Sequence, residues 1–367
     1  MDPAPTNILI IKPSALGDIV MVLPALNALR TLLPQATISW LVQPEFAPLL
    51  EDHPQLDRII SFDRQRLAGT WRNIHSLRAL LHLRRDLRGQ QFDCVLDFQG
   101  LLRSALLGHF TGTTLLVGMA NAREGAHWLY SRTIHQDTNN LHVVDFNLKL
   151  VQSLSAEPLP QAQFVFPRPP EARAWAQTLF EQRALARRSY VVFVAGSTQG
   201  DKCWPAKRFA DLADRLHNAF GLPILAVGSA GEAETIDQIG RQSRRPLLSL
   251  AGQTSLPQLV ALLDSAALVV ANDTGPGHVA AGLGVPLVML FSWSNPARIY
   301  PYRRPECMVA VDPFGRGRQI KSRDPRHNVR NITVDEVFER ACEQLNGQPG
   351  RTATNTPSTS EPSRAGH

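Results

Sequence analysis

The stretch KPSALGDIVMVLPAL, residues 12–26, carries a carboxylate where an anion-binding loop would not. It follows the apolar run ILII, and a strand that enters a helix through a glycine-containing turn is typical of a phosphate site, because free N–H groups at a helix start attract anions. Asp18 would repel a phosphate there and occupy those N–H groups. It is therefore either an ordinary helix cap or a group kept for another purpose, such as accepting a proton.

A second loop of the same plan has the residues that an anion needs. After YVVFVAG, the stretch STQGDKCWP supplies Ser197, Thr198 and Lys202 ahead of a helix that should begin near Pro205. Hydroxyls, backbone N–H groups and one ammonium group together suit a diphosphate. The spacing is not that of a Walker A loop. Taken alone, Lys202 is as consistent with a surface lysine.

A third loop places polar groups at the end of another strand. ANDTGPGHVAAGLGVP, residues 271–286, brings Asp273, Thr274, Gly275 and His278 to the start of a helix. Glycines let the backbone approach a ligand closely, and ligands of open parallel sheets bind at the C-terminal ends of strands. The alternative is that Asp273 only caps the helix and His278 is a structural histidine.

Glu232, in ILAVGSAGEAETI, begins the helix after a further strand. A carboxylate there can accept hydrogen bonds from ribose hydroxyls, by analogy with dinucleotide sites. It can equally be no more than a favourable charge at a helix N-terminus. The ends of the three strands in the second half of the chain together offer a cation, hydroxyls, a ribose acceptor and glycine-rich backbone. This combination predicts a nucleoside-diphosphate site.

An anion site in the second half of the chain explains the carboxylate in the first half. Asp18 is then available as a general base that faces the anion, and a base opposite a diphosphate leaving group indicates group transfer to a hydroxyl. No two aspartates are separated by one residue, so the paired-aspartate metal clamp of many sugar-nucleotide enzymes is absent from the sequence. We expect Lys202, His278 and helix dipoles to meet the diphosphate charge, with no metal and no cofactor.

Alternating strands and helices must position these loops. Continuous apolar runs separated by helical patterns are typical of buried parallel strands. The expected strands are ILIIK, ISWLV and CVLDF in the first part and YVVFVAG, ILAVG, LVVAN and PLVMLF in the second. The sequence therefore predicts an α/β chain with two doubly wound parallel sheets.

The proline-rich stretch AEPLPQAQFVFPRPPEARAWAQ separates the two series of strands. We expect an N-terminal domain over residues 1–165 and a linker over 166–186. A C-terminal domain should follow over 187–345 and end in a capped helix that begins near Thr333. The Pro, Ser, Thr and Gly content of residues 346–367 predicts a disordered tail.

Composition limits the class of protein. The 367 residues, 44% of them hydrophobic, exceed what one core normally serves, and the formal net charge of +6 predicts an anionic partner. The four cysteines lack CxxC spacing, so neither a zinc site nor a disulfide framework is indicated. No secretion signal, long apolar run or nucleic-acid-binding motif is present, so we expect a cytoplasmic protein without a nucleic-acid partner.

The motifs, in this order, resemble those of glycosyltransferase family 9, the ADP-heptose:lipopolysaccharide heptosyltransferases. The resemblance rests on KPSALGDIVMVLPALNALR, DFQGLLRSALL, GSTQGDKCWP, VGSAGEAE and NDTGPGHVAAGLGVP, and it covers the chain to about residue 345. It implies the GT-B fold, in which two Rossmann-like domains face a central cleft, and an inverting transfer that needs no metal. The implied reaction moves a heptose from ADP-heptose to the lipopolysaccharide inner core, on a Kdo–lipid A type of acceptor.

The resemblance also implies roles for single residues. Asp18 matches the general base, and Lys202 matches the group that meets the charge of the leaving diphosphate. Arg103 and Arg123 could bind the acceptor's phosphates or carboxylates, although ordinary surface arginines are an equally good interpretation. Donor contacts are implied for Ser197, Thr198, Lys202, Glu232, Thr254, Leu256, Asp273, Thr274, Gly275 and His278.

The chain departs from the family pattern in two places. Relatives often read FGPTDP where this chain has FSWSNP, so Ser292, Trp293 and Asn295 replace residues near the donor, and Met21 stands where a histidine is common. Another nucleotide sugar or acceptor therefore remains an alternative. The implied partners are ADP-heptose and a lipid-anchored oligosaccharide at the inner face of the cytoplasmic membrane, and we expect a monomer that binds this surface peripherally.

Two other classes of protein remain as alternatives. A dinucleotide-dependent oxidoreductase needs a GxGxxG turn followed by an acidic residue, and the loop KPSALGD lacks those glycines. A non-catalytic protein could use the basic charge alone to bind a membrane or a nucleic acid.

Overall fold

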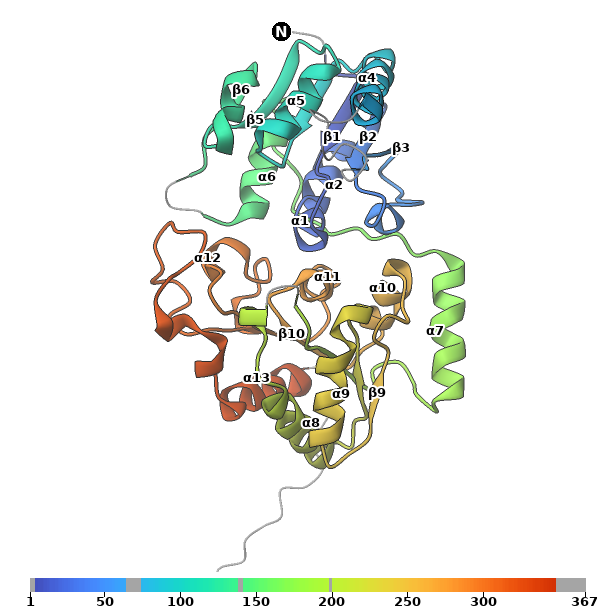
Figure 1. Cartoon of the computed structure of the whole chain (residues 1–367), viewed down its shortest axis with the longest axis vertical. Coiled ribbons are helices and arrows are strands. Elements are labelled where there is room, and N and C mark those ends of the chain that lie inside the picture. The colour runs from blue at the N-terminus through green and yellow to red at the C-terminus, as the bar shows by residue number, and fades with distance from the viewer. Residues whose placement is uncertain (1–3, 64–73, 138–140, 198–199, 348–367) are drawn as a thin grey trace, which may run out of the picture.

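The structure is a computed structural model that describes residues 4–63, 74–137, 141–197 and 200–347. It consists of two α/β domains, one above the other in Figure 1. Each domain is built on one parallel sheet of six strands. The prediction of two doubly wound parallel sheets, and with it the GT-B architecture, is confirmed.

The first sheet has the strand order β3-β2-β1-β4-β5-β6. Its strands are β1 (Asn7–Ile11), β2 (Thr37–Val42), β3 (Arg58–Ser61), β4 (Cys94–Asp97), β5 (Leu115–Met119) and β6 (Arg132–Ile134). One face is covered by α1 (Leu16–Val20), α2 (Leu23–Leu32) and α6 (Val143–Gln152). The other face is covered by α4 (Ile74–Gly89), α5 (Leu102–Phe110) and the 3₁₀ helix η2 (Arg123–Leu129).

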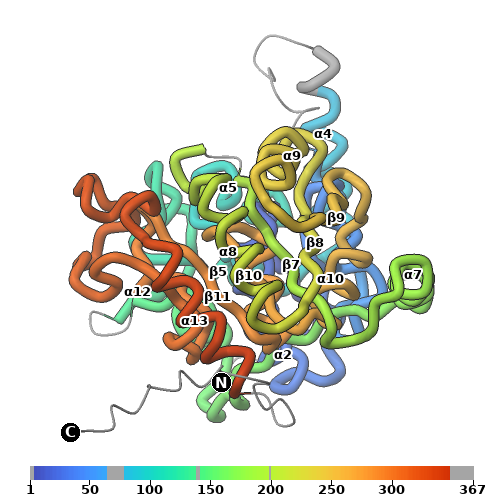
Figure 2. Tube along the Cα trace, turned by 90° about the horizontal axis from the view of Figure 1, so that it is seen from below, coloured from blue at the N-terminus to red at the C-terminus, as the bar shows by residue number. Residues whose placement is uncertain are grey.

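The second sheet repeats this topology as β12-β11-β10-β7-β8-β9. Its strands are β7 (Val191–Val194), β8 (Ile224–Ala226), β9 (Leu247–Ser249), β10 (Leu268–Asn272), β11 (Leu287–Leu290) and β12 (Met308–Val309). One face carries α7 (Pro170–Gln182), α10 (Leu256–Asp264) and α11 (Gly275–Gly282), and α7 lies beside α10 at the edge of the domain (Figure 2). The other face carries α8 (Ala206–Phe220), α9 (Ala233–Gln242) and α13 (Val334–Asn346).

Alternation along each strand explains why helices cover both faces. In β1, Ile8 and Ile10 point into one hydrophobic cluster, whereas Leu9 and Ile11 point into another, and all four are fully buried. The cluster that contains Ile8 also contains Val192 and Val269 of the second sheet. One apolar core therefore runs through both domains.

The strand order places a ligand site in each domain. In a doubly wound sheet, the strand order reverses between the first and fourth strands. Ligands bind there, beyond the C-terminal ends of these two strands. Those positions are β1 beside β4 in the first sheet and β7 beside β10 in the second. Helices α1 and α11, which follow β1 and β10, contact each other across the domain boundary (Figure 1).

All seven predicted strands are present, and the helices expected near Pro205 and Thr333 have those residues as their N-caps. The segment expected as a linker contains α7, whose buried side chains Ala172, Ala176 and Phe180 pack on the second domain. Proline suits the first turn of a helix, where its missing N–H has no partner to lose, so Pro169 and Pro170 start this helix. The predicted tail, residues 346–367, lies outside the described residues from 348 onward, and Asn346 is the last residue of α13. Within the described ranges, no helix is both long and apolar enough to cross a membrane.

Candidate active site between the two domains

A cavity of about 470 Å³ lies where the two domains meet. The second domain contributes residues from the loops that follow β7, β8, β9 and β10, and the first domain contributes Ala15, Leu16, Gly17 and Phe46. A cavity of this size is in the range that binds small ligands and cofactors. We call it the donor cavity.

The donor cavity collects most of the predicted donor contacts. The lining includes Ser197, Lys202, Glu232, Thr254, Leu256, Asp273, Thr274 and Gly275. His278 does not line the cavity but contacts Asp273 from behind it. Thr198 lies outside the described residues. Four separate loops thus bring together residues that are up to 78 positions apart, from Ser197 to Gly275.

Asp273 joins Lys202 and His278, the two side chains that were predicted to meet the charge of the diphosphate. Its Oδ2 accepts a hydrogen bond from Lys202 Nζ at 2.8 Å, and its Oδ1 lies 3.2 Å from His278 Nε2. Burial alone would raise the pKa of Asp273, but the hydrogen bond and charge of His278 and the charge of Lys202 outweigh it and hold this pKa below its usual range. An ammonium group has three N–H donors, so Lys202 retains donors for a ligand.

Asn272, the last residue of β10, fixes the loop that carries Lys202. Its side chain is fully buried, donates to the carbonyl of Ala195 at 2.7 Å and accepts from the N–H of Trp204 at 3.1 Å. Both partners flank the Lys202 turn. A single buried amide therefore holds the loops after β7 and β10 in a fixed relation.

Glu232 serves two purposes with its two oxygens. Oε2 accepts hydrogen bonds from the N–H and hydroxyl of Ser229, which caps the short helix η4 (Ala230–Glu232). Oε1 lies over Gly196, where a Cβ would come within 2.2 Å of it. Oε1 accepts no hydrogen bond from the described part of the chain and faces the same cavity, so it can accept one from a ribose hydroxyl.

The first domain reaches the donor cavity through α1. A Cβ at Gly17 would lie 2.6 Å from Cδ2 of His278, and a Cβ at Gly275 would lie 2.7 Å from the Cβ of Leu16. Each of these glycines therefore allows close approach of the opposite helix. The contact places the loop after β1 directly against the loop after β10.

Asp18 lies one residue beyond this contact, and it is not a helix cap, because the N-cap of α1 is Ala15. Its carboxylate is 55% exposed and pairs with Lys12 Nζ at 3.3 Å. Lys12 is itself buried and donates to the carbonyl of Phe98 at 3.3 Å. Sequence reasoning missed Lys12, although its position at the end of the first strand was a usable signal.

A buried carboxylate organises the loop after β4. Asp97 is fully buried and accepts hydrogen bonds from the Tyr130 and Ser104 hydroxyls at 2.7 and 2.8 Å and from the N–H groups of Gln99 and Gly100. Burial raises the pKa of Asp97, and these hydrogen bonds oppose the rise. The network fixes the start of α5.

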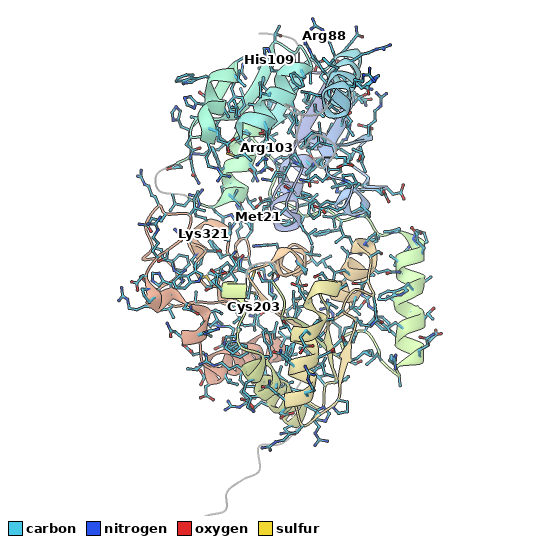
Figure 3. The ribbon with its side chains drawn as sticks, in the orientation of Figure 1. Met21, Arg88, Arg103, His109, Cys203 and Lys321 are labelled. Carbon is cyan, nitrogen blue, oxygen red and sulfur yellow. The ribbon has the colours of Figure 1, made fainter. Side chains whose placement is uncertain are left out.

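The two predicted acceptor arginines lie on segments that adjoin the loop after β4. Arg103 is exposed and lines a small pocket of about 40 Å³ with Pro13 and Ser14 of the loop after β1. Figure 3 shows Arg103 on the first domain and Cys203 on the second, on opposite sides of the boundary. Arg123 is exposed at the start of η2, and its backbone N–H donates a hydrogen bond to the carbonyl oxygen of Gly100 at 3.0 Å. The two arginines therefore extend from adjoining segments.

The FSWSNP segment supports the donor site from behind. The Ser292 hydroxyl donates to the carbonyl of Asp201 at 3.1 Å, beside Lys202. Arg316 is buried and donates to the carbonyls of Ser292 and Ser294. Met21, the other departure, is 5% exposed and accepts a hydrogen bond on its carbonyl from the Asn147 side chain. None of these groups lines the donor cavity.

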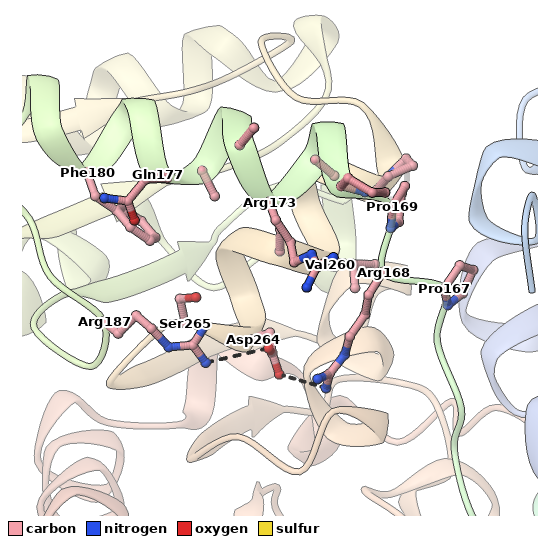
Figure 4. Close-up of a pocket in the computed structure, with 16 residues that line it drawn as sticks. Pro167, Arg168, Pro169, Arg173, Gln177, Phe180, Arg187, Val260, Asp264 and Ser265 are labelled. Carbon is pink, nitrogen blue, oxygen red and sulfur yellow. Dashed lines mark ion pairs between the residues drawn. The ribbon is translucent and has the colours of Figure 1, made fainter.

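A separate cavity of about 540 Å³ lies between α7 and α10 (Figure 4). Asp264 pairs there with Arg168 at 3.5 Å and with Arg187 at 3.7 Å. It contains none of the predicted site residues, so its larger volume does not make it the better candidate. Among the described residues, no group of three histidine, cysteine or acidic side chains is placed to hold a metal ion.

Comparisons with known proteins show the family of the chain. The model of glycosyltransferase family 9 (heptosyltransferase) matches residues 80–329. A "Lipopolysaccharide heptosyltransferase 1" of Pseudomonas aeruginosa is 30% identical over 316 residues, which cover 83% of this chain and 84% of that protein.

Solved structures give the same result. A glycosyltransferase family 9 structure from Veillonella parvula, 22% identical, has a TM-score of 0.79 and covers 94% of this chain and 98% of its own, which shows the shared fold. The E. coli heptosyltransferase WaaC with ADP-2-deoxy-2-fluoro heptose is 26% identical, with a TM-score of 0.70, and the match covers 92% of this chain and 99% of that one.

Proposed function

The chain belongs to glycosyltransferase family 9, the heptosyltransferases, and we propose that it moves a heptose from ADP-heptose to the lipopolysaccharide inner core, with inversion and without a metal. As a member of this family it is a glycosyltransferase. One observation carries the finer proposal. Residues from four strand ends, chosen from the sequence as donor contacts, line one cavity whose opposite wall is the loop before Asp18.

The proposed reaction is a single displacement at the anomeric carbon. Asp18 takes the proton of the acceptor hydroxyl as the oxygen forms its bond to that carbon, and the bond from the carbon to the diphosphate oxygen breaks. ADP leaves with the electron pair. Because the base belongs to the first domain and the diphosphate site to the second, attack and departure occur on opposite sides of the sugar, which inverts its configuration.

Lys202 and the N-terminus of α11 meet the charge that develops on the leaving diphosphate. Lys202 retains N–H donors beside Asp273, and Gly275 and its neighbours present backbone at the helix start. Asp273 acts as a positioning residue, because both of its oxygens are engaged by Lys202 and His278. With this charge met by protein groups, the proposed displacement proceeds without a metal ion.

The same arrangement supports a division between the domains. We assign the acceptor to the N-terminal domain, residues 1–165, and the donor to the C-terminal domain, residues 187–345, with 166–186 joining them. Glu232 then binds the ribose, Thr254 and Leu256 border the base, and Arg103 and Arg123 face the acceptor.

We further propose that the acceptor is lipid-anchored and that the protein therefore acts at the inner face of the cytoplasmic membrane. We also propose that it acts as a monomer. The support is an apolar surface on the first domain, formed by Leu102, Leu106 and Trp128, with Trp128 85% exposed. Arg103 and Arg123 adjoin it on α5 and η2. Exposed aromatic and aliphatic side chains beside arginines suit an anionic lipid surface.

A thermal-shift comparison of ADP, UDP, GDP and NAD tests the donor assignment. A nucleotide that binds only the folded protein raises its melting temperature in proportion to its affinity. We expect ADP to give the largest rise and ADP-heptose to be consumed when the acceptor is added. A larger rise with NAD than with any nucleoside diphosphate would favour the oxidoreductase alternative.

A further inference from the structure

A second interdomain cavity, of about 210 Å³, has no assigned role. The first domain contributes the loops that follow β5 and β6, and the second contributes α12 (Pro296–Ile299) and the segment after Arg316. It shares no lining residue with the donor cavity. The polar side chains that line it are Asn121, His135, Gln136, Asp137, Arg298 and Arg318.

The cavity has more positive charge than its own carboxylate can balance. Within the described ranges, the guanidinium groups of Arg298 and Arg318 make no ion pair and no hydrogen bond to another residue. Asp137, the one acidic group of the lining, pairs with Lys149 at 3.4 Å. Arg298 is half-buried, and burial lowers its pKa with no carboxylate to offset the loss of hydration. Such a group gains most from an added anion.

The two arginines are held in place by one buried side chain. Asn295 is 1% exposed, and its Oδ1 accepts the N–H of Ala297 at 3.2 Å, which starts the helix that carries Arg298. Its Nδ2 donates to the carbonyls of Gly317 and Gln319 at 2.9 and 2.7 Å, on either side of Arg318. Asn295 therefore links the two backbone segments that carry Arg298 and Arg318.

We propose that Arg298 and Arg318 bind an acidic group of the acceptor, a carboxylate or a phosphate, across the boundary between the domains. The planar guanidinium group is suited to both anions, since it can donate two parallel hydrogen bonds. The loops after β5 and β6 belong to the domain assigned to the acceptor, and Asn121 lies two residues before Arg123. The inference rests on the proposed function and adds a second-domain contribution to acceptor binding.

Steady-state kinetics of the full-length protein test this proposal. We expect Arg298→Ala and Arg318→Ala each to raise the acceptor KM by about tenfold, with the donor KM and kcat changed less than about twofold. Arg298→Lys should recover part of the loss, because a lysine keeps the charge but not the paired hydrogen bonds. The matched control is Arg183→Ala, at the exposed end of α7, which removes the same charge far from the cavity.

The outcomes are distinguishable. If wild-type protein transfers no sugar from ADP-heptose, the proposed function fails. If wild-type protein is active and both alanine variants keep its acceptor KM, or if the donor KM rises instead, the acceptor site is refuted. Acceptors that lack either the carboxylates or the phosphates show which anion Arg298 binds. Removal of that anion should raise the acceptor KM of the wild-type protein but not that of Arg298→Ala.

Discussion

At the scale of single residues, the donor cavity has its charge balanced in advance. Asp273 accepts from Lys202 and lies against His278, so the donor cavity presents a buried ion pair instead of an unpaired cation. An unpaired buried charge is costly, and the carboxylate also aims the ammonium group toward the ligand. The base candidate is arranged in the same way, with Asp18 exposed and its partner Lys12 buried.

Substitution of Asp18 tests the base. Asp18→Asn keeps the size of the side chain but cannot accept the proton, so we expect kcat to fall by about 10²–10⁴-fold. ADP affinity, measured by calorimetry, should stay within about twofold, because Asp18 does not line the donor cavity. Asp237→Asn, an exposed acid on α9, is the control. Normal turnover of Asp18→Asn would remove the residue from the reaction.

The Asp273 cluster predicts an acid dependence of stability. The pKa of Asp273 is lowered in the folded protein, so its contribution is present above its unfolded pKa and is lost as pH falls through the folded pKa. At neutral pH, Asp273→Asn should therefore cost about 3 kcal/mol of unfolding free energy. The difference should shrink only below roughly pH 4. Melting temperatures of both proteins across the acid range measure this, and a difference that does not depend on pH would contradict it.

At the scale of elements, α1 and α11 join the two domains through a close contact at Gly17 and Gly275. In Gly17→Ala, the added methyl group would need to displace the His278 ring, which it would approach to 2.6 Å. We expect the melting temperature to fall and the rate of transfer to drop by about tenfold or more, since His278 supports Asp273. Gly240→Ala is the matched control, because its added Cβ would meet nothing within 4 Å on α9. Equal behaviour of the two variants would show that this contact tolerates separation.

Sequence patterns predicted the inner strands of both sheets, except β5, but not the edge strands. The seven strands found from the sequence are largely buried, whereas β3, β6, β9 and β12 are the edge strands and are more exposed. β5 was missed because Gly118 interrupts its apolar run. The ring of Tyr130 fills the space there, within 2.3 Å of where a Cβ would be.

The candidate site was predictable to the extent that it follows strand ends. Lys202, Glu232 and Asp273 each follow a strand that the sequence identifies, so their convergence could be expected. The pairs Lys12–Asp18 and Lys202–Asp273 could not, because they depend on the path of each loop. Arg298 and Arg318 were missed for the same reason, since their segments are brought together by loop contacts such as those of the Asn295 side chain.

At the scale of the whole molecule, the apolar surface of the first domain predicts membrane binding. Trp128→Ser and Leu106→Gln should reduce cosedimentation with vesicles that contain anionic phospholipid, and binding of the wild-type protein should weaken as salt is raised. Transfer to an acceptor dissolved in detergent should be unaffected. Phe314→Ser, which removes an exposed apolar side chain of the second domain, is the control. Unchanged vesicle binding in both first-domain variants would exclude this surface.

The strands are divided between the sheets strictly in chain order, β1 to β6 in one and β7 to β12 in the other. The first sheet is thus complete before any strand of the second leaves the ribosome, and domains generally fold as units during synthesis. Until α11 is made, Leu16 and its neighbours on α1 lack their later partners. The nascent chain therefore exposes this apolar surface until the second domain folds, and this is the stage at which we expect molecular chaperones to bind it.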